Sequence, residues 1–227
     1  MAVVPVIAID GPSGSGKGSV ALMVARALGY HVLDSGALYR LLALAALNKG
    51  IAPADEPALA AEAAHLPVSF VEGEPGEPAR VLLAGQDVGD RIREEDVGQM
   101  ASRISGHPAV RAALMDLQRN FARSPGLVAD GRDMGTVVFP SAPVKIFLDA
   151  DVVERARRRE KQLLGQGLSA NLPRLVEDLR ARDDRDRNRP VAPLKPAPDA
   201  VVIDSTHLGR EEVFQQIMVI VRARGLG

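Results

Sequence analysis

The stretch that decides the fold is Val6-Ile7-Ala8-Ile9-Asp10, followed at once by Gly11-Pro12-Ser13-Gly14-Ser15-Gly16-Lys17-Gly18-Ser19. The apolar run before the first glycine predicts a buried strand of a parallel sheet. A helix is predicted from Lys17 to Leu28, and Gly29 suits its C-terminal cap. The residues between strand and helix match G-x-x-x-x-G-K in the context that this motif requires. We therefore expect a phosphate-binding loop here, and a glycine-rich turn without a ligand is the much weaker interpretation.

Such a loop would bind phosphate mainly through its backbone. Successive N–H groups turn inward around the anion, and the helix N-terminus adds a favourable dipole. Lys17 is expected to bridge the β- and γ-phosphate oxygens of a nucleotide and to follow the migrating charge. Gly18 separates Lys17 from the hydroxyl of Ser19, a form typical of nucleoside monophosphate kinases rather than GTPases. Whether Ser19 contacts Mg²⁺ directly or through water stays open at this point.

The rest of the chain alternates strands with helices around one interruption. Parallel strands are predicted at 31–34, 127–130, 144–148 and 200–204, and helices at 35–49, 109–122, 152–164, 172–183 and 211–222. This alternation predicts an α/β fold with a doubly wound, five-stranded parallel sheet formed by residues 1–52 and 107–227. Residues 53–106 read as an inserted subdomain, with a helix at 95–104 and a small antiparallel sheet at 68–71, 80–83 and 86–92 around a Gly-, Pro- and Glu-rich turn.

Composition excludes several classes of protein. The 227 residues contain no Cys, which excludes a disulfide framework and a thiolate metal site. We find no signal peptide and no apolar run of the roughly 20 residues that a membrane helix needs, so we expect a cytoplasmic protein. The net charge of -1 and the 3% of aromatic residues argue against a nucleic-acid-binding module, which would use basic charge and base stacking. Only five of the 28 basic residues are Lys, and Arg is the side chain that binds phosphate in a bidentate way.

Four groups of residues are candidates for binding a second anionic ligand. Ser35 and Arg40 follow the second strand, and Arg132 and Asp133 follow the third in a tight glycine-flanked turn. Arginines also gather at 155–159, at the start of an expected lid of about residues 155–170, and in the block from Arg182 to Arg189. Because ligands of such sheets bind beyond the carboxyl ends of the strands, all four could face one crevice. Taken singly, Ser35 and Arg40 could equally be a helix cap and a solvated arginine, and the Arg132–Asp133 turn could be merely structural, which is the weaker interpretation. The two arginine groups, taken singly, read more simply as solvated helix faces.

Together these stretches resemble the bacterial cytidylate kinase family. The resemblance rests on the loop form, on Leu33-Asp34-Ser35-Gly36-Ala37-Leu38-Tyr39-Arg40, on the run from Ala129 to Pro140, and on Arg182 to Arg189. It implies that ATP is bound by Gly11, Pro12, Ser13, Gly14, Ser15, Gly16, Lys17, Gly18 and Ser19, with Arg155, Arg158 and Arg159. It implies that Ser35, Arg40, Arg132 and Arg189 hold the phosphate of CMP, that Ser102, Arg111 and Asp133 read cytosine, and that Arg182 and Asp186 hold the sugar and nearby phosphate oxygens.

The activity that the resemblance implies is transfer of the γ-phosphoryl group of ATP to CMP or dCMP, with Mg²⁺. Lys17, Arg132, Arg182 and Arg189 would stabilise the transferring charge. We expect a monomer, with no nucleic-acid or membrane partner. Three alternatives remain at this point: a P-loop kinase for a sugar or sugar acid, a protein that senses a nucleotide without turnover, and an RNA-binding module that uses the arginine blocks.

Overall fold

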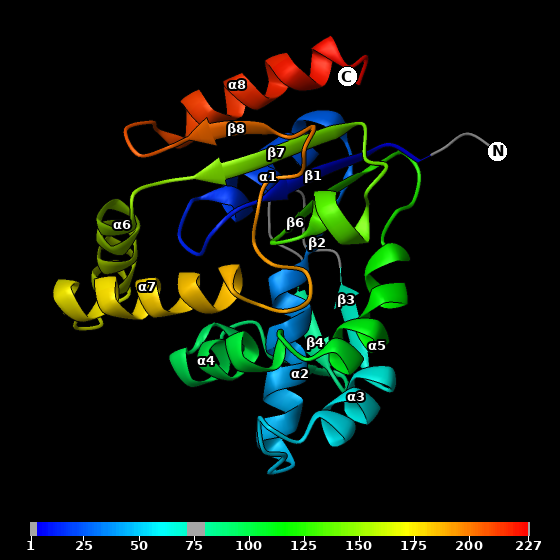
Figure 1. The fold of residues 1–227 in the computed structure, drawn as a ribbon, viewed down its shortest axis with the longest axis vertical. Coiled ribbons are helices and arrows are strands. Elements are labelled where there is room, and N and C mark those ends of the chain that lie inside the picture. The colour runs from blue at the N-terminus through cyan, green and yellow to red at the C-terminus, as the bar shows by residue number, and fades with distance from the viewer. Residues whose placement is uncertain (1–3, 72–79, 227) are drawn as a thin grey trace. The chain divides into compact units, whose positions relative to one another are not determined.

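The computed structural model describes residues 4–71 and 80–226, and the chain divides into two compact units. One unit comprises Met1–Asp34 and Gln118–Gly227, and the other is the continuous segment Ser35–Leu117. The expected boundaries at residues 53 and 106 stay a prediction, because compact units need not coincide with a functional subdomain. Each unit has its own sheet, as Figure 1 shows.

The larger unit is built on a five-stranded parallel sheet with the order β2-β6-β1-β7-β8. Its strands are β1 (Val6–Asp10), β2 (His31–Asp34), β6 (Leu127–Gly131), β7 (Val144–Asp149) and β8 (Val201–Asp204). Its helices are α1 (Lys17–Leu28), the π-helix η2 (Met134–Val138), α6 (Val152–Gly165), α7 (Leu172–Arg187) and α8 (Arg210–Ala223). The predicted α/β fold and its five parallel strands are confirmed.

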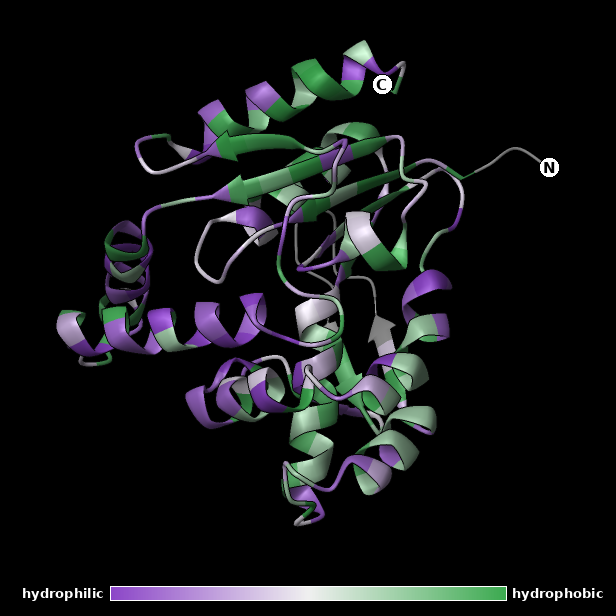
Figure 2. Cartoon of the chain, in the orientation of Figure 1, coloured by the Kyte–Doolittle hydropathy of each residue, from purple (hydrophilic) through white to green (hydrophobic). Residues whose placement is uncertain are grey.

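An aliphatic core lies between this sheet and the helices α1 and α8. The strands β1 and β6 are buried along their whole length, as expected for central parallel strands. Ile7 and Ile9 pack with Val20 and Val24 of α1 and with Ile217 of α8. In Figure 2 the strands are coloured mainly hydrophobic, whereas α6 and α7 carry many hydrophilic residues. The core therefore fixes the carboxyl end of β1, where the glycine-rich loop begins.

The smaller unit combines helices with a three-stranded antiparallel sheet, β3-β4-β5. Its elements are α2 (Ser35–Asn48), α3 (Glu56–Ala64), β3 (Val68–Val71), β4 (Arg80–Leu83), β5 (Gln86–Asp87), the 3-10 helix η1 (Arg91–Arg93), α4 (Glu95–Ile104) and α5 (Pro108–Arg119), whose last residues enter the larger unit. The predicted small sheet is confirmed. The turn expected between its first two strands lies outside the described residues.

Four local predictions need correction. The strand expected at 86–92 ends at Asp87, and a 3-10 helix follows at Arg91. Helix α3 was not predicted, although Asp55 caps it by accepting a hydrogen bond from the Ala58 N–H. Helix α7 continues four residues beyond the predicted end, to Arg187. The turn expected after β6 leads directly into the π-helix η2.

Candidate active site

The glycine-rich loop adopts a backbone that only glycine tolerates at its first position. Gly11 has a φ of 155°, and a Cβ atom there would lie 2.1 Å from the Leu148 carbonyl oxygen of β7. At the other end Gly16, with a φ of 94°, precedes α1 and offers no side-chain cap. The N–H groups of the first turn of α1 therefore lack the usual side-chain acceptor and are available to an anion.

Side chains hold three carbonyl oxygens of the same loop. Lys17 Nζ donates to the Pro12 oxygen at 3.1 Å, and Arg155 Nη1 donates to the Ser13 oxygen at 2.9 Å. The Ser15 oxygen accepts from Ser205 Oγ at 3.1 Å. Ser205 comes from the loop after β8 and is buried. The loop is thus braced by Arg155 of α6 (Val152–Gly165), by Ser205 and by its own lysine. Sequence reasoning did not identify Ser205.

The buried lysine of the loop lies beside a buried carboxylate. Lys17 Nζ is 4.0 Å from Asp130 Oδ1, and both side chains are about nine-tenths buried. Burial, reinforced by the charge of Arg132, lowers the pKa of Lys17 to about 8. Burial raises the pKa of Asp130 to about 7, although Lys17 opposes this shift. Both pKa values are therefore shifted toward neutrality.

Asp130 is a candidate residue that the sequence assignment omitted. The available signal was its place at the end of a parallel strand, which it shared with other aspartates.

No group of three or more His, Asp or Glu side chains suited to a metal occurs within residues 4–71 and 80–226. Over the same residues, no helix is long and apolar enough to cross a membrane.

Four predicted acceptor residues lie together in the larger unit. Arg132 Nε donates to Asp186 Oδ2 at 2.9 Å, and Asp186 is buried. Burial alone would raise the pKa of Asp186, but the charges of Arg132, Arg182 and Arg189 hold it below its usual value. On α7 and just after it, Asp183, Asp186 and Arg189 are buried at intervals of three residues, so this part of the charge block is an inward face. Asp133 follows Arg132 and is buried as well.

The smaller unit brings together a second set of predicted residues. Arg111 is buried, its guanidinium lies 5.8 Å from the centre of the Tyr39 ring, and its Nη1 donates to the Ser105 oxygen at 3.2 Å. Ser105 Oγ in turn donates to the Ser102 oxygen at 3.0 Å, which places Ser102 in the same neighbourhood.

The remaining residues of this set lie on α2. Ser35 is buried at the start of the helix. About one turn on, Arg40 Nη1 donates to the Ile92 oxygen at 2.7 Å. Arg111 and Ser102 are therefore neighbours in the smaller unit, and the ligands of these four residues stay a prediction.

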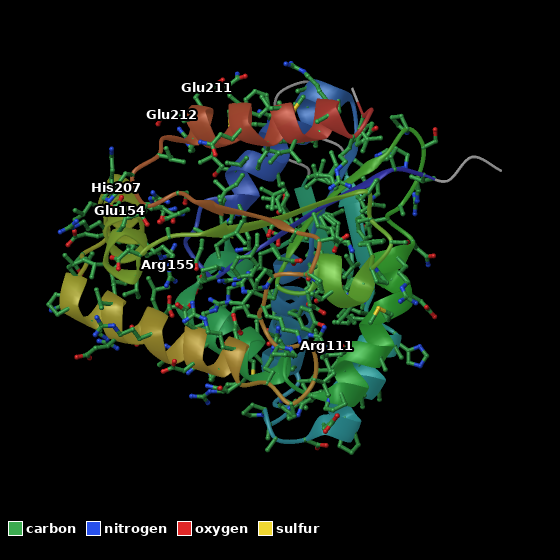
Figure 3. The ribbon with its side chains drawn as sticks, turned by 45° about the horizontal axis from the view of Figure 1, so that its top comes forward. Arg111, Glu154, Arg155, His207, Glu211 and Glu212 are labelled. Carbon is green, nitrogen blue, oxygen red and sulfur yellow. The ribbon has the colours of Figure 1, made fainter. Side chains whose placement is uncertain are left out.

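The arginines of α6 do not form one exposed arm. Arg155 is 2% exposed and points toward α7 (Figure 3), where Asp183 accepts from both of its terminal nitrogens. Its Nε donates to the Ala150 oxygen at 2.9 Å. Arg158 donates to the Ser205 backbone oxygen, whereas Arg159 pairs with Gln162 on its own helix. Contact of these arginines with ATP stays a prediction. The sequence did not suggest that Arg155 would link Ser13 of the loop to Asp183 of α7.

A cavity of about 580 Å³ opens at the carboxyl ends of β7 and β8. Arginines and aspartates of α6 and α7 line it, with Val202 and Thr206. No residue of the glycine-rich loop lines it, so the cavity is distinct from the phosphate cradle. Arg155 is shared, because it lines the cavity and contacts Ser13 of the loop.

Comparison with known proteins gives consistent matches over almost the whole chain. A family model described as "Cytidylate kinase" matches residues 7–223. The "Cytidylate kinase" of Pseudomonas entomophila is 56% identical over 222 residues, covering 98% of this chain and 97% of that protein. That of Azotobacter vinelandii is 56% identical over 227 residues, covering 100% and 99%. The solved structure of TT1252 from Thermus thermophilus covers 100% of both chains at 22% identity, but its TM-score of 0.48 carries no argument about the fold.

Proposed function

The chain belongs to the cytidylate kinase family, and we propose that it transfers the γ-phosphoryl group of ATP to CMP or dCMP, giving CDP or dCDP and ADP. It is thus an ATP-dependent nucleoside monophosphate kinase. The observation that carries the proposal is the braced glycine-rich loop, with Lys17 beside Asp130, in the same unit as the cluster of Arg132, Arg182 and Asp186. A phosphate cradle and a cluster of arginines are the two parts that transfer between phosphates needs.

Transfer between two phosphates needs little acid–base chemistry. The attacking oxygen of a nucleoside monophosphate is already anionic at pH 7, so no strong general base is required. Catalysis then consists of holding the two anions in line and neutralising the charge that spreads over the transferring group. We assign neutralisation to Lys17, Arg132, Arg182 and Arg189. The loop N–H groups would hold the ATP phosphates, and Arg158 and Arg159 are proposed to contact ATP near them.

Phosphoryl transfer from ATP usually needs a divalent metal, and we propose Mg²⁺. The residues beside the loop fit this ion, because Ser19 presents an exposed hydroxyl and Asp130 a carboxylate, both oxygen ligands. With no protein cluster of three acidic or histidine ligands among the described residues, the ion would be held mainly by the phosphates and water. When bound, it would supply positive charge that offsets the negative charge of the phosphates. Asp130 and Ser19 would orient it through direct or water-mediated contacts.

We propose that cytosine is selected by its hydrogen-bonding pattern. Cytosine presents an N4 amine donor beside the acceptors N3 and O2. Asp133 can accept from N4, while Arg111 can donate to N3 or O2, with Ser102 beside it. Uracil reverses the polarity at positions 3 and 4, which would leave buried groups without partners. The resulting preference for CMP over UMP should be about 100-fold or more.

The acceptor phosphate is assigned to Ser35, Arg40, Arg132 and Arg189, and the sugar to Arg182 and Asp186. We propose that the enzyme works as a monomer. We also propose that it acts in the cytoplasm, where ATP and pyrimidine monophosphates are available to it.

The test is to measure ADP production from ATP and Mg²⁺ with six acceptors in parallel: CMP, dCMP, UMP, AMP, GMP and gluconate. We expect rapid turnover with CMP and dCMP, and much slower turnover with the others. Turnover with gluconate alone would show a sugar-acid kinase instead. ATP binding without turnover on any acceptor would show a nucleotide-sensing protein and end the kinase proposal.

A further inference from the structure

The proposed chemistry does not use Asp10, although it is a buried carboxylate next to the glycine-rich loop. It is the last residue of β1 and is 4% exposed. Its two oxygens each accept one backbone hydrogen bond from the same turn: Oδ1 from the Met134 N–H at 2.7 Å, and Oδ2 from the Gly135 N–H at 2.8 Å. Burying a carboxylate costs free energy unless it is hydrogen-bonded, so both contacts matter to its position.

Asp10 performs the capping task of another residue. The first N–H groups of a helix have no partner within the helix, and the side chain of the preceding residue usually accepts from them. Asp133 is the residue that precedes η2, and it is of a type that caps well, but its side chain makes no cap hydrogen bond. The N–H groups of Met134 and Gly135 are instead satisfied by Asp10, from a neighbouring strand.

Asp10 also lies opposite the other end of the same turn. In the register of β1 with β6, Asp10 pairs with Gly131. The backbone is thus tied to one residue of β1 at Gly131 and again at Met134 and Gly135. Only Arg132 and Asp133 lie between these two attachments. A shift of the Asp10 carboxylate would therefore displace Met134 and Gly135, and with them the two residues that lie between the attachments.

We propose that Asp10 is a positioning residue that sets the place of Arg132 and Asp133 and, through them, the recognition of the cytosine-bearing acceptor. This inference rests on the proposed function, because it takes Arg132 and Asp133 as the acceptor-reading residues. Asp10 itself would touch neither substrate. Because Asp10 adjoins Gly11, a general disturbance of β1 would weaken ATP binding as well as CMP binding. Loss of the cap alone should weaken only CMP binding, so the two effects can be distinguished.

The test compares Asp10→Asn with the wild-type enzyme. The amide has the shape of the carboxylate, but its NH₂ group cannot accept from Gly135 or Met134, so one N–H of η2 loses its partner. We expect KM for CMP to rise about tenfold, which corresponds to about 1.4 kcal/mol, with KM for ATP changed by less than about threefold. The ratio of kcat/KM for CMP to that for UMP should fall as well. The matched control is Asp199→Asn, the same substitution at an exposed carboxylate that pairs with Lys145, and it should leave both KM values unchanged.

A second variant serves if Asp10→Asn does not fold. A methyl group at Gly135 would lie only 3.2 Å from the Lys145 side chain and at ordinary contact distance, 3.4 Å, from Asp10 Oδ2. Gly135→Ala therefore keeps the carboxylate and displaces the capped turn from the Lys145 side. The same rise in KM for CMP is expected. Wild-type KM for CMP in the folded variants, or equal losses for CMP and ATP, would overturn the inference. If the wild-type enzyme itself does not prefer CMP, the proposed function fails instead. The acceptor preference of the wild-type enzyme is measured without either variant, so the two failures can be distinguished.

Discussion

Breaking the buried pair between Arg155 and Asp183 should destabilise the protein far more than removing the pair altogether. Both side chains are at least 95% buried. Removing one partner of such a pair leaves an uncompensated buried charge, at a cost of about 3–5 kcal/mol. For a chain of this length, each kcal/mol lowers Tm by about 2–4 °C. We therefore expect Arg155→Met to lower Tm by about 6–20 °C.

Asp183→Leu and the double variant complete the cycle. Asp183→Leu leaves the Arg155 charge buried, although the Ala150 and Ser13 oxygens still accept from it. The double variant buries no unpaired charge, so it should be more stable than either single variant. Its free energy of unfolding should therefore exceed the value predicted by adding the two single effects by at least about 3 kcal/mol. Denaturant unfolding followed by circular dichroism measures the three free energies of unfolding. Additivity within about 0.5 kcal/mol would refute the coupling that the geometry implies.

Three further predictions concern the loop and its surroundings. Lys17→Met should lower kcat by about a thousandfold or more while far-ultraviolet circular dichroism stays that of the wild type, because the lysine charge follows the transferring group; wild-type turnover would remove Lys17 from the mechanism. Ser205→Ala should raise KM for ATP about threefold to tenfold, since one buried hydrogen bond to the Ser15 oxygen, worth about 0.5–1.5 kcal/mol, is lost; unchanged ATP kinetics would show that the loop does not need this brace. Burial raises the pKa of Asp10 from 3.8 to about 6. The protonated side chain therefore contributes fully to the free energy of unfolding below pH 4, and this contribution is lost as the pH rises through 6. The Tm of the wild type minus that of Asp10→Asn should fall over that range, and a constant difference would contradict the pKa shift.

The sequence predicted the candidate site best where its residues are consecutive along the chain. The glycine-rich loop occupies consecutive positions, and its strand and helix begin and end where the apolar pattern predicts. The charge block of α7 was also found, but the pattern of alternating charges could not show which side chains face inward. Tertiary packing determines which of them are buried: Asp183 and Asp186 are buried, and Asp184 is exposed.

The bracing residues were not found from the sequence, because their partners are distant along the chain. Asp10 bonds to a residue 124 positions away, and Ser205 to one 190 positions away. The pairing of Arg155 with Asp183 was not expected either, since an arginine-rich helix suggests an exposed basic surface and the buried partner lies 28 positions on. Helix α3 was missed because its alanine-rich sequence has little amphipathic pattern to distinguish it.

The strand order has a consequence for how the protein is made. β1 leaves the ribosome early, but the strands that pair with it begin at Leu127 and Val144. The middle strand of the sheet therefore cannot form its hydrogen bonds until more than half of the chain has been synthesised. The segment Ser35–Leu117 is continuous, so it can complete its own contacts during that interval. We expect nascent chains shorter than about 150 residues to expose the apolar β1 and to need chaperone protection, with the phosphate-binding loop forming only after β7 has been synthesised.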